Sequence, residues 1–299
     1  MNASKTGYLN DNFKMFHLTD NLQKTYDYHY HDFIKILLFI SGDVTYCIEG
    51  RSYVLQPYDV VLVDAGEVHR PVINSPSTYE RIIIYVSSEF LSSYTTEQYD
   101  LGYCLQKARE EHSHVLRCAS LSKSRLYQVS RELEQSFGDQ DFAGELYSRL
   151  LFLEFMIQLN RASIHDSISY AEMDCASPKI LEVMQYINTN LGEELSIDQL
   201  SAMFYLSKYY LMHSFKEETG YTIGNYITAK RLFLARELIQ AGRTITEACF
   251  ESGFKNYSSF SRAYKKMYHE IPRDLLKEDF IASAATHPVD QSASDVKSR

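Results

Sequence analysis

One short pattern occurs twice between residues 196 and 275, and it restricts the fold more than any other feature of this chain. Each copy predicts a short helix, a break and a second helix, in the ranges Ser196–Phe204, Tyr205–Ser207 and Lys208–Glu218, and then Thr244–Glu251, Ser252–Lys255 and Asn256–Met267. Such a helix-turn-helix unit inserts its second helix into the major groove of DNA. The doubling therefore predicts a reader of two adjacent groove segments.

The two copies align at an offset of 49 residues, with Leu211 and Phe215 matching Phe260 and Tyr264. The i, i+4 spacing directs both pairs to one helix face, which we expect to be the core. The opposite face carries side chains that can bond base edges and phosphates. These candidate DNA contacts are Ser207, Lys208, Tyr209, Tyr210, His213, Lys216, Lys255, Asn256, Ser258, Ser259, Arg262, Lys265 and Lys266. For any one of them, a plain solvated face is the alternative.

Helix start signals surround both units and define an all-helical region at 178–280. Ser177 and Pro178 predict a cap and a first-turn proline, and Ser196–Gln199 and Thr244–Glu247 have the capping-box form. One long helix is predicted over Ile223–Ala241, between the units. Residues 162–177 are expected to be a linker, and the polar residues 281–299 a disordered tail.

The charge distribution agrees with contact to DNA despite a net charge of −9. Residues 1–177 hold 15 basic and 24 acidic residues, whereas residues 178–280 hold 13 of each. Four cations lie between Lys255 and Lys266 with no acid among them. The local field at the contact matters more than the total charge.

Residues 1–161 predict a second domain of strands followed by helices. Apolar alternation with Gly, Pro and Asp punctuation between 26 and 90 is typical of a barrel or sandwich. Helices are predicted over Leu126–Phe137 and Phe142–Arg161. A narrow apolar stripe follows the second of these, formed by Leu146, Leu150, Leu153 and Ile157. The stripe either pairs two protomers or packs on its own domain.

Residues 178–276 resemble the DNA-binding domain of AraC/XylS-type transcription regulators. The residues that carry the resemblance are Leu195-Ser196-Ile197, Phe215–Gly220, Lys230-Arg231-Leu232 with Ala235, Gly253-Phe254, Ser259–Arg262, Tyr264–Lys266 and Ile271-Pro272. The resemblance implies two helix-turn-helix subdomains joined by a central helix, each entering the major groove. This chain departs from the family pattern at three positions: His213 replaces the usual arginine, His269 the usual glycine, and Lys255 a small polar cap.

The N-terminal region is similar to the cupin-type sensor domain of the same family. The similarity rests on His29-Tyr30-His31, Pro57-Tyr58-Asp59 and His69-Arg70-Pro71. Lys35 stands where metal-binding cupins have a glutamate, and an ammonium group would repel a cation. We therefore predict no metal and no cofactor, although three histidines are enough for a zinc site. The candidate ligand-pocket residues are His29, His31, Tyr46, Tyr53, His69, Arg70 and Tyr85, with purely structural roles as the alternative.

These inferences together predict an α+β protein with a cupin-like sensing and dimerisation domain at 1–161 and a DNA-binding domain at 178–280. We expect a transcription regulator and not an enzyme: a homodimeric activator that binds double-stranded DNA, contacts RNA polymerase and responds to a small polar molecule such as a saccharide. The alternatives are a metal-dependent cupin enzyme and a regulator without a small effector. No apolar run reaches the ~20 residues of a membrane span, and five scattered cysteines fit reduced thiols in the cytoplasm.

Overall fold

The computed structural model describes residues 4–5, 7, 9, 11–20, 25–117, 123–136, 140–165, 168–175 and 177–274, so the predicted tail at 281–299 lies outside the described residues. The chain divides into two compact units. The first combines Met1–Ile187 with Ser196–Ile223, and the second combines Asn188–Leu195 with Gly224–Arg299. Most strands precede the helices, with β10 (Val115–Arg117) and β11 (Ser169–Tyr170) between helices, and this arrangement confirms the predicted α+β class. None of the helices in these ranges is both long enough and apolar enough to cross a bilayer.

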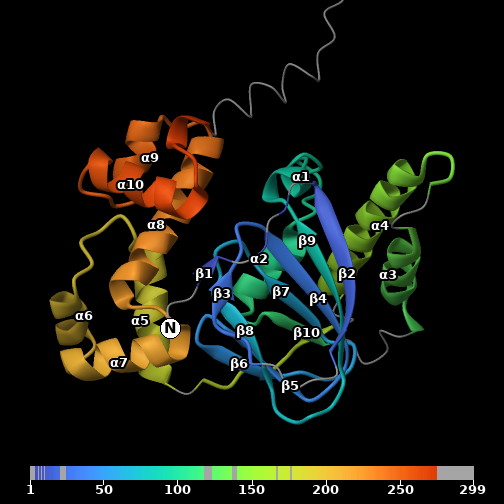
Figure 1. The fold of residues 1–299 in the computed structure, drawn as a ribbon, viewed down its shortest axis with the longest axis horizontal. Coiled ribbons are helices and arrows are strands. Elements are labelled where there is room, and N and C mark those ends of the chain that lie inside the picture. The colour runs from blue at the N-terminus through green and yellow to red at the C-terminus, as the bar shows by residue number, and fades with distance from the viewer. Residues whose placement is uncertain are drawn as a thin grey trace, which may run out of the picture. The chain divides into compact units, whose positions relative to one another are not determined.

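The strands of the first compact unit form two sheets, and strands β1 to β9 are shown in blue to teal in Figure 1. One sheet has the order β1-β3-β8-β5-β6, from Ser4–Lys5, His29–Tyr30, His69–Ile73, Val44–Ile48 and Arg51–Val54. The other has the order β11-β10-β7-β4-β9-β2, from Ser169–Tyr170, Val115–Arg117, Val60–Val63, Ile34–Ser41, Tyr79–Val86 and Phe13–Asp20. All pairings except β1 with β3 are antiparallel.

Strand β4 shows how the alternation of side chains divides the core. Leu37 and Phe39 point inward, into a cluster that takes buried residues from both sheets. Ile36 and Leu38 point outward, into a second cluster that the helices complete. Because both faces of β4 are apolar apart from Lys35, residues 34–39 are buried and the register with β9, with Ile36 opposite Ile84, is fixed from both sides.

Four helices cover the outer face of the six-stranded sheet. They are α1 (Ser88–Ser92), α2 (Tyr103–Glu110), α3 (Arg125–Ser136) and α4 (Gly144–Ile164). Helices α3 and α4 lie side by side in Figure 1, in green. Helix α4 buries Phe152, Phe155 and Leu159 against the sheet cluster, which places its inner face.

The remaining helices lie in the predicted all-helical region and include the double unit. They are α5 (Pro178–Thr189), α6 (Ile197–Met203), α7 (Lys208–Thr219), α8 (Ile223–Gln240), α9 (Ile245–Glu251) and α10 (Tyr257–Tyr268). Both predicted capping boxes are present, at Ser196 with Gln199 and at Thr244 with Glu247. Each box satisfies two backbone donors at a helix start, and this explains why the sequence located these helices to within one or two residues.

Candidate nucleic-acid interface and sensor site

Helix α7 presents a polar outer face because its apolar side chains are used inward. Leu211 and Phe215 are 0% exposed, as predicted. The hydroxyl of Ser207 caps the helix by accepting a hydrogen bond from the backbone N–H of Tyr210 at 3.2 Å. The same geometry directs the other predicted contact residues to solvent, where they are all exposed: Lys208, Tyr209, Tyr210, His213 and Lys216.

Two of the exposed cationic or titratable side chains of α7 already have acidic neighbours. The amine of Lys208 lies 2.7 Å from the carboxylate of Asp198, and Nδ1 of His213 lies 3.2 Å from that of Glu217. Lys216 has no ion-pair partner within the ranges that the structure covers. The first helix-turn-helix unit therefore presents hydrogen-bonding groups with little excess positive charge.

Helix α10 repeats the architecture with a more basic surface. Phe260 and Tyr264 are 0% exposed, and the side chain of Asn256 caps the helix by accepting from the N–H of Ser259 at 2.9 Å. The cap is thus Asn256 and not the preceding Lys255, whose amine lies 2.6 Å from Glu194. The remaining predicted contacts lie along the helix: Ser258, Arg262, Lys265 and Lys266 are exposed, and Ser259 is half-buried.

The cations of α10 are available for an anionic partner. Across residues 177–274, no ion pair engages Arg262, Lys265 or Lys266. The Nε–H of Arg262 donates to the backbone carbonyl of Ser258 at 3.2 Å, which leaves the end of the guanidinium group outward. His269 ends the helix in the left-handed conformation, with φ of 62°, which is the role that the family's glycine usually has.

The predicted sensor histidines come together inside the sensor domain. One ring nitrogen from each of His29, His31 and His69 lies within 4.8 Å of the other two. Nδ1 of His29 lies 2.9 Å from the carbonyl of Asp27, and Nδ1 of His69 lies 3.0 Å from that of Glu67. When these nitrogens donate to the carbonyls, Nε2 of both rings keeps its lone pair.

Burial keeps His29 and His69 of this cluster neutral. Desolvation, with a smaller contribution from Lys35, lowers the pKa of His29 to about 4, and it lowers the pKa of His69 well below its ordinary value. The neutral imidazole is the form that binds metal ions, so among the described residues these three histidines could hold one. The amine of Lys35 lies 3.3 Å from Nε2 of His69, where a cation would otherwise approach.

Lys35 differs from the sequence-based expectation of a repelling ammonium group. Its side chain is buried, and burial followed by the nearby Arg81 lowers its pKa to about 7. Close to half of the amines are therefore neutral at neutral pH. Lys35 therefore repels a cation less than the sequence suggested, and this weakens the argument on which our prediction of no metal was based.

The other predicted pocket residues fall into two groups. Tyr46 stacks on His69 with 6.0 Å between ring centroids, and Tyr85 lies 5.3 Å from His31, so both belong to the histidine cluster. The hydroxyl of Tyr46 is buried and has no hydrogen-bond partner among the described residues. Tyr53 and Arg70 make other contacts. The Tyr53 hydroxyl accepts from the N–H of His114 at 3.2 Å, and the Arg70 guanidinium lies over the ring of Tyr28 at 4.2 Å.

The predicted stripe on α4 lies on the solvent side of the helix. Leu146, Leu150 and Ile157 are 53%, 55% and 39% exposed, and Leu153 is half-buried. Leu151, Phe152 and Phe155 are the residues that fill the domain's own core. Half-buried Leu153 also packs against this core, so part of the stripe is covered by its own domain and the rest is exposed.

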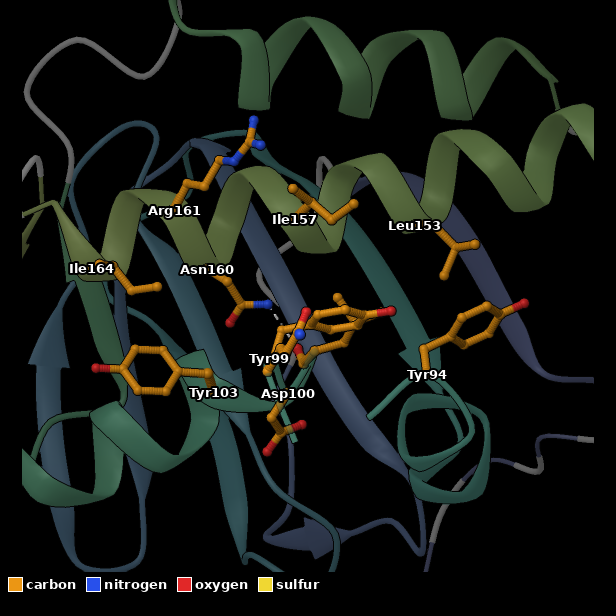
Figure 2. A pocket seen from close by; sticks show the side chains of 11 residues that line it. Tyr94, Tyr99, Asp100, Tyr103, Leu153, Ile157, Asn160, Arg161 and Ile164 are labelled. Atoms are coloured by element: carbon orange, nitrogen blue, oxygen red, sulfur yellow. Dashed lines mark hydrogen bonds between the residues drawn. The ribbon is translucent and has the colours of Figure 1, made fainter. Parts of the chain in front are cut away.

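Sequence reasoning missed a cavity between α4 and the segment that joins α1 to α2. It has a volume of about 680 Å³, and Figure 2 shows the side chains that line it. The lining residues are Tyr94, Gln98, Tyr99, Asp100, Leu101, Tyr103, Leu153, Ile157, Asn160, Arg161 and Ile164. The available signal was the density of tyrosines at 94, 99 and 103, which no periodicity explains.

Known proteins match both parts of the chain. The family model of the AraC-like ligand binding domain matches residues 15–151, and that of a helix-turn-helix domain matches residues 200–278. The HTH-type transcriptional activator RhaS from Shigella sonnei is 21% identical over 259 residues, which cover 85% of this chain and 88% of RhaS. The RhaS protein of Escherichia coli matches with the same identity and coverage.

Solved structures with similarity to this chain include whole regulators and isolated domains. ToxT from Vibrio cholerae is 15% identical over 89% of this chain and 97% of its own, with a TM-score of 0.35. The DNA-binding domain of AdpA, solved with a target DNA, is 18% identical over 37% of this chain and all of its own, with a TM-score of 0.34.

Proposed function

This chain belongs to the AraC/XylS family of transcription regulators, and we propose that it activates transcription when a small polar molecule, most simply a saccharide, binds the sensor domain. The observation that carries the proposal is the pair of capped helix-turn-helix units, each with an apolar inner face and a hydrogen-bonding outer face, in one chain with an AraC-like ligand-binding domain. Activation in particular is supported by the relatives named as activators.

The effector site that we propose is the histidine cluster with Tyr46. Neutral imidazoles and a phenol offer donors and acceptors without a fixed charge, which suits the hydroxyl groups of a sugar. The buried hydroxyl of Tyr46, which lacks a partner among the described residues, supports a ligand there because an unsatisfied buried polar group costs about 1–3 kcal/mol. No metal is part of this proposal.

We infer that the protein acts as a homodimer in the cytoplasm, where the chromosome is, and that it contacts RNA polymerase instead of catalysing a reaction. The exposed leucines of α4 support pairing, because an apolar stripe on a helix is usually covered. Pairing would bring two double units to paired DNA sites, and the ligand would alter how they bind.

Two experiments test the proposal on the full chain. A genome-wide map of bound DNA, followed by footprinting, should show protection of two major-groove segments about one helical turn apart. Binding that is indifferent to sequence, or a footprint confined to one groove segment, would refute the DNA assignment.

The effector is tested by thermal shift with a panel of sugars and small acids, with and without chelator. A true ligand should raise the melting temperature progressively as its concentration exceeds the dissociation constant, and the rise should shrink in Tyr46→Phe, which removes one hydroxyl. Stabilisation that disappears with chelator and returns with zinc would show that the histidines hold a metal and that our prediction was wrong.

A further inference from the structure

The cavity beside α4 has the size and the preformed shape of a ligand site. Its volume of about 680 Å³ lies within the range of roughly 300–1,000 Å³ that is usual for small-molecule pockets. It lies on the outer side of the sheet, away from the histidine cluster, between α4 and the turn before α2. It is therefore a second site, different from the one proposed for the effector.

Hydrogen bonds hold the wall of this cavity in place, buried ones at Asn160 and exposed ones at Asp100. The side-chain carbonyl of Asn160 accepts from the N–H of Cys104 at 2.7 Å, and its amide donates to the carbonyl of Leu101 at 2.8 Å. The carboxylate of Asp100 accepts from the N–H of Gly102 at 2.7 Å and from the hydroxyl of Thr95 at 3.0 Å. The site does not have to form at the moment of binding, so a ligand loses little of its affinity to ordering.

The chemistry of the lining favours an uncharged ring. Tyr94, Tyr99 and Tyr103 lie in a row beneath α4, and apolar side chains of the helix face them (Figure 2). The two charged groups lie at the edge: Asp100 is engaged by its own turn, and the guanidinium of Arg161 points away from the tyrosines in Figure 2. Stacking on tyrosine rings suits an aromatic ligand, and the phenolic hydroxyls can bond a polar group on it.

Two residues of the α4 stripe also line the cavity. Leu153 and Ile157 line the cavity and also belong to the stripe, whereas Leu146 and Leu150 belong to the stripe alone. A molecule that rests against Leu153 and Ile157 changes the surface that a second protomer meets. Ligand binding and pairing are then coupled, and the coupling is reciprocal.

We propose that this cavity binds an uncharged aromatic molecule carrying a hydroxyl group, and that its occupancy regulates pairing through α4. The coupling rests on the dimerisation proposed above, but the binding does not. The site therefore gives the sensor domain a second input that differs in chemistry from a saccharide.

The test uses 2-naphthol as the probe and the full chain as the receptor, with affinity measured by isothermal titration. The wild type should bind saturably, and Tyr99→Ala should weaken binding about tenfold, as expected for the loss of one aromatic contact. Tyr99 is 56% exposed, so the change leaves the core intact. Tyr147→Ala is the matched control, because Tyr147 is 49% exposed on α4 and does not line the cavity.

The titration decides the site, and sedimentation decides the coupling. Absence of saturable binding, or an equal loss in Tyr99→Ala and Tyr147→Ala, would overturn the site. A loss in Tyr46→Phe but not in Tyr99→Ala would move the probe to the histidine cluster and also overturn it. Sedimentation with and without 2-naphthol tests the coupling, and a shift in the monomer–dimer equilibrium supports it. A protein that binds the probe at Tyr99 but stays monomeric refutes both the regulation and the dimer, while the binding site itself stands.

Discussion

Lys35 should destabilise the sensor domain at neutral pH, and Lys35→Met should relieve the cost. The amine lies inside the sheets, 3.3 Å from Nε2 of His69 and 5.6 Å from the ring centroid of Tyr46. Arg81, on the neighbouring strand β9, adds a like charge, and its own ion pair is with Asp20 at 2.6 Å. Among the described residues no carboxylate pairs with Lys35 itself.

The size of the effect follows from the pKa of the amine. Burial lowers this pKa from 10.5 to about 7. Between these two values the unfolded chain binds more protons than the folded one, so stability rises with pH across this window. At pH 7 the penalty is about 4 kcal/mol relative to a neutral side chain. The hydrogen bond to His69 returns about 1 kcal/mol, so Lys35→Met should gain about 3 kcal/mol.

Urea unfolding at pH 7 and pH 9, followed by far-ultraviolet circular dichroism because the chain has no tryptophan, measures the prediction. The advantage of Lys35→Met should shrink by about 2 kcal/mol at the higher pH, because the wild-type amine is then neutral in the folded protein and less often protonated in the unfolded chain. Lys14→Met, at an exposed site on β2, is the control and should change little. A variant less stable than the wild type at pH 7, or an advantage independent of pH, would refute the reasoning.

Three further predictions concern the other surfaces. Leu150→Asp should place a charge in the α4 stripe and yield monomers in sedimentation. A wild type that is already monomeric at micromolar concentration would contradict this prediction. Arg262→Ala should weaken specific DNA binding by about 1–3 kcal/mol if its guanidinium contacts a base. The loss should exceed that of His213→Ala, because His213 already has an acidic neighbour. Equal losses in titrations against one operator would contradict this. His269→Gly should stabilise the second unit by about 1 kcal/mol in thermal unfolding, because its φ of 62° suits glycine; a loss of stability would refute this.

The double unit was predictable because its signals are local. Capping boxes, i, i+4 apolar pairs and a helix-ending position each depend on residues within one or two turns. Leu211, Phe215, Phe260 and Tyr264 were all expected in the core, and all are 0% exposed.

The missed features depend on contacts between distant residues. Strand β2 carries a mixture of polar and apolar side chains, and it is defined by pairing with β9, far along the chain. The cavity beside α4 depends on Asn160, which bonds the backbone of residues more than fifty positions earlier. The pKa of Lys35 depends on burial, which the sequence around it does not state. Only tertiary structure brings these groups together.

The two helix-turn-helix units bury equivalent apolar positions and differ in the charge that their outer faces present. Lys208 and His213 on α7 have acidic neighbours, whereas Arg262, Lys265 and Lys266 on α10 have no ion-pair partners within residues 177–274. When unpaired cations neutralise phosphates, the DNA releases its condensed counterions, and this release supplies affinity without sequence preference. Side chains that are already paired gain less from a phosphate and more from a contact that fits their geometry. We therefore expect the second unit to supply most of the salt-dependent affinity and the first to depend more on the match between α7 and its bases.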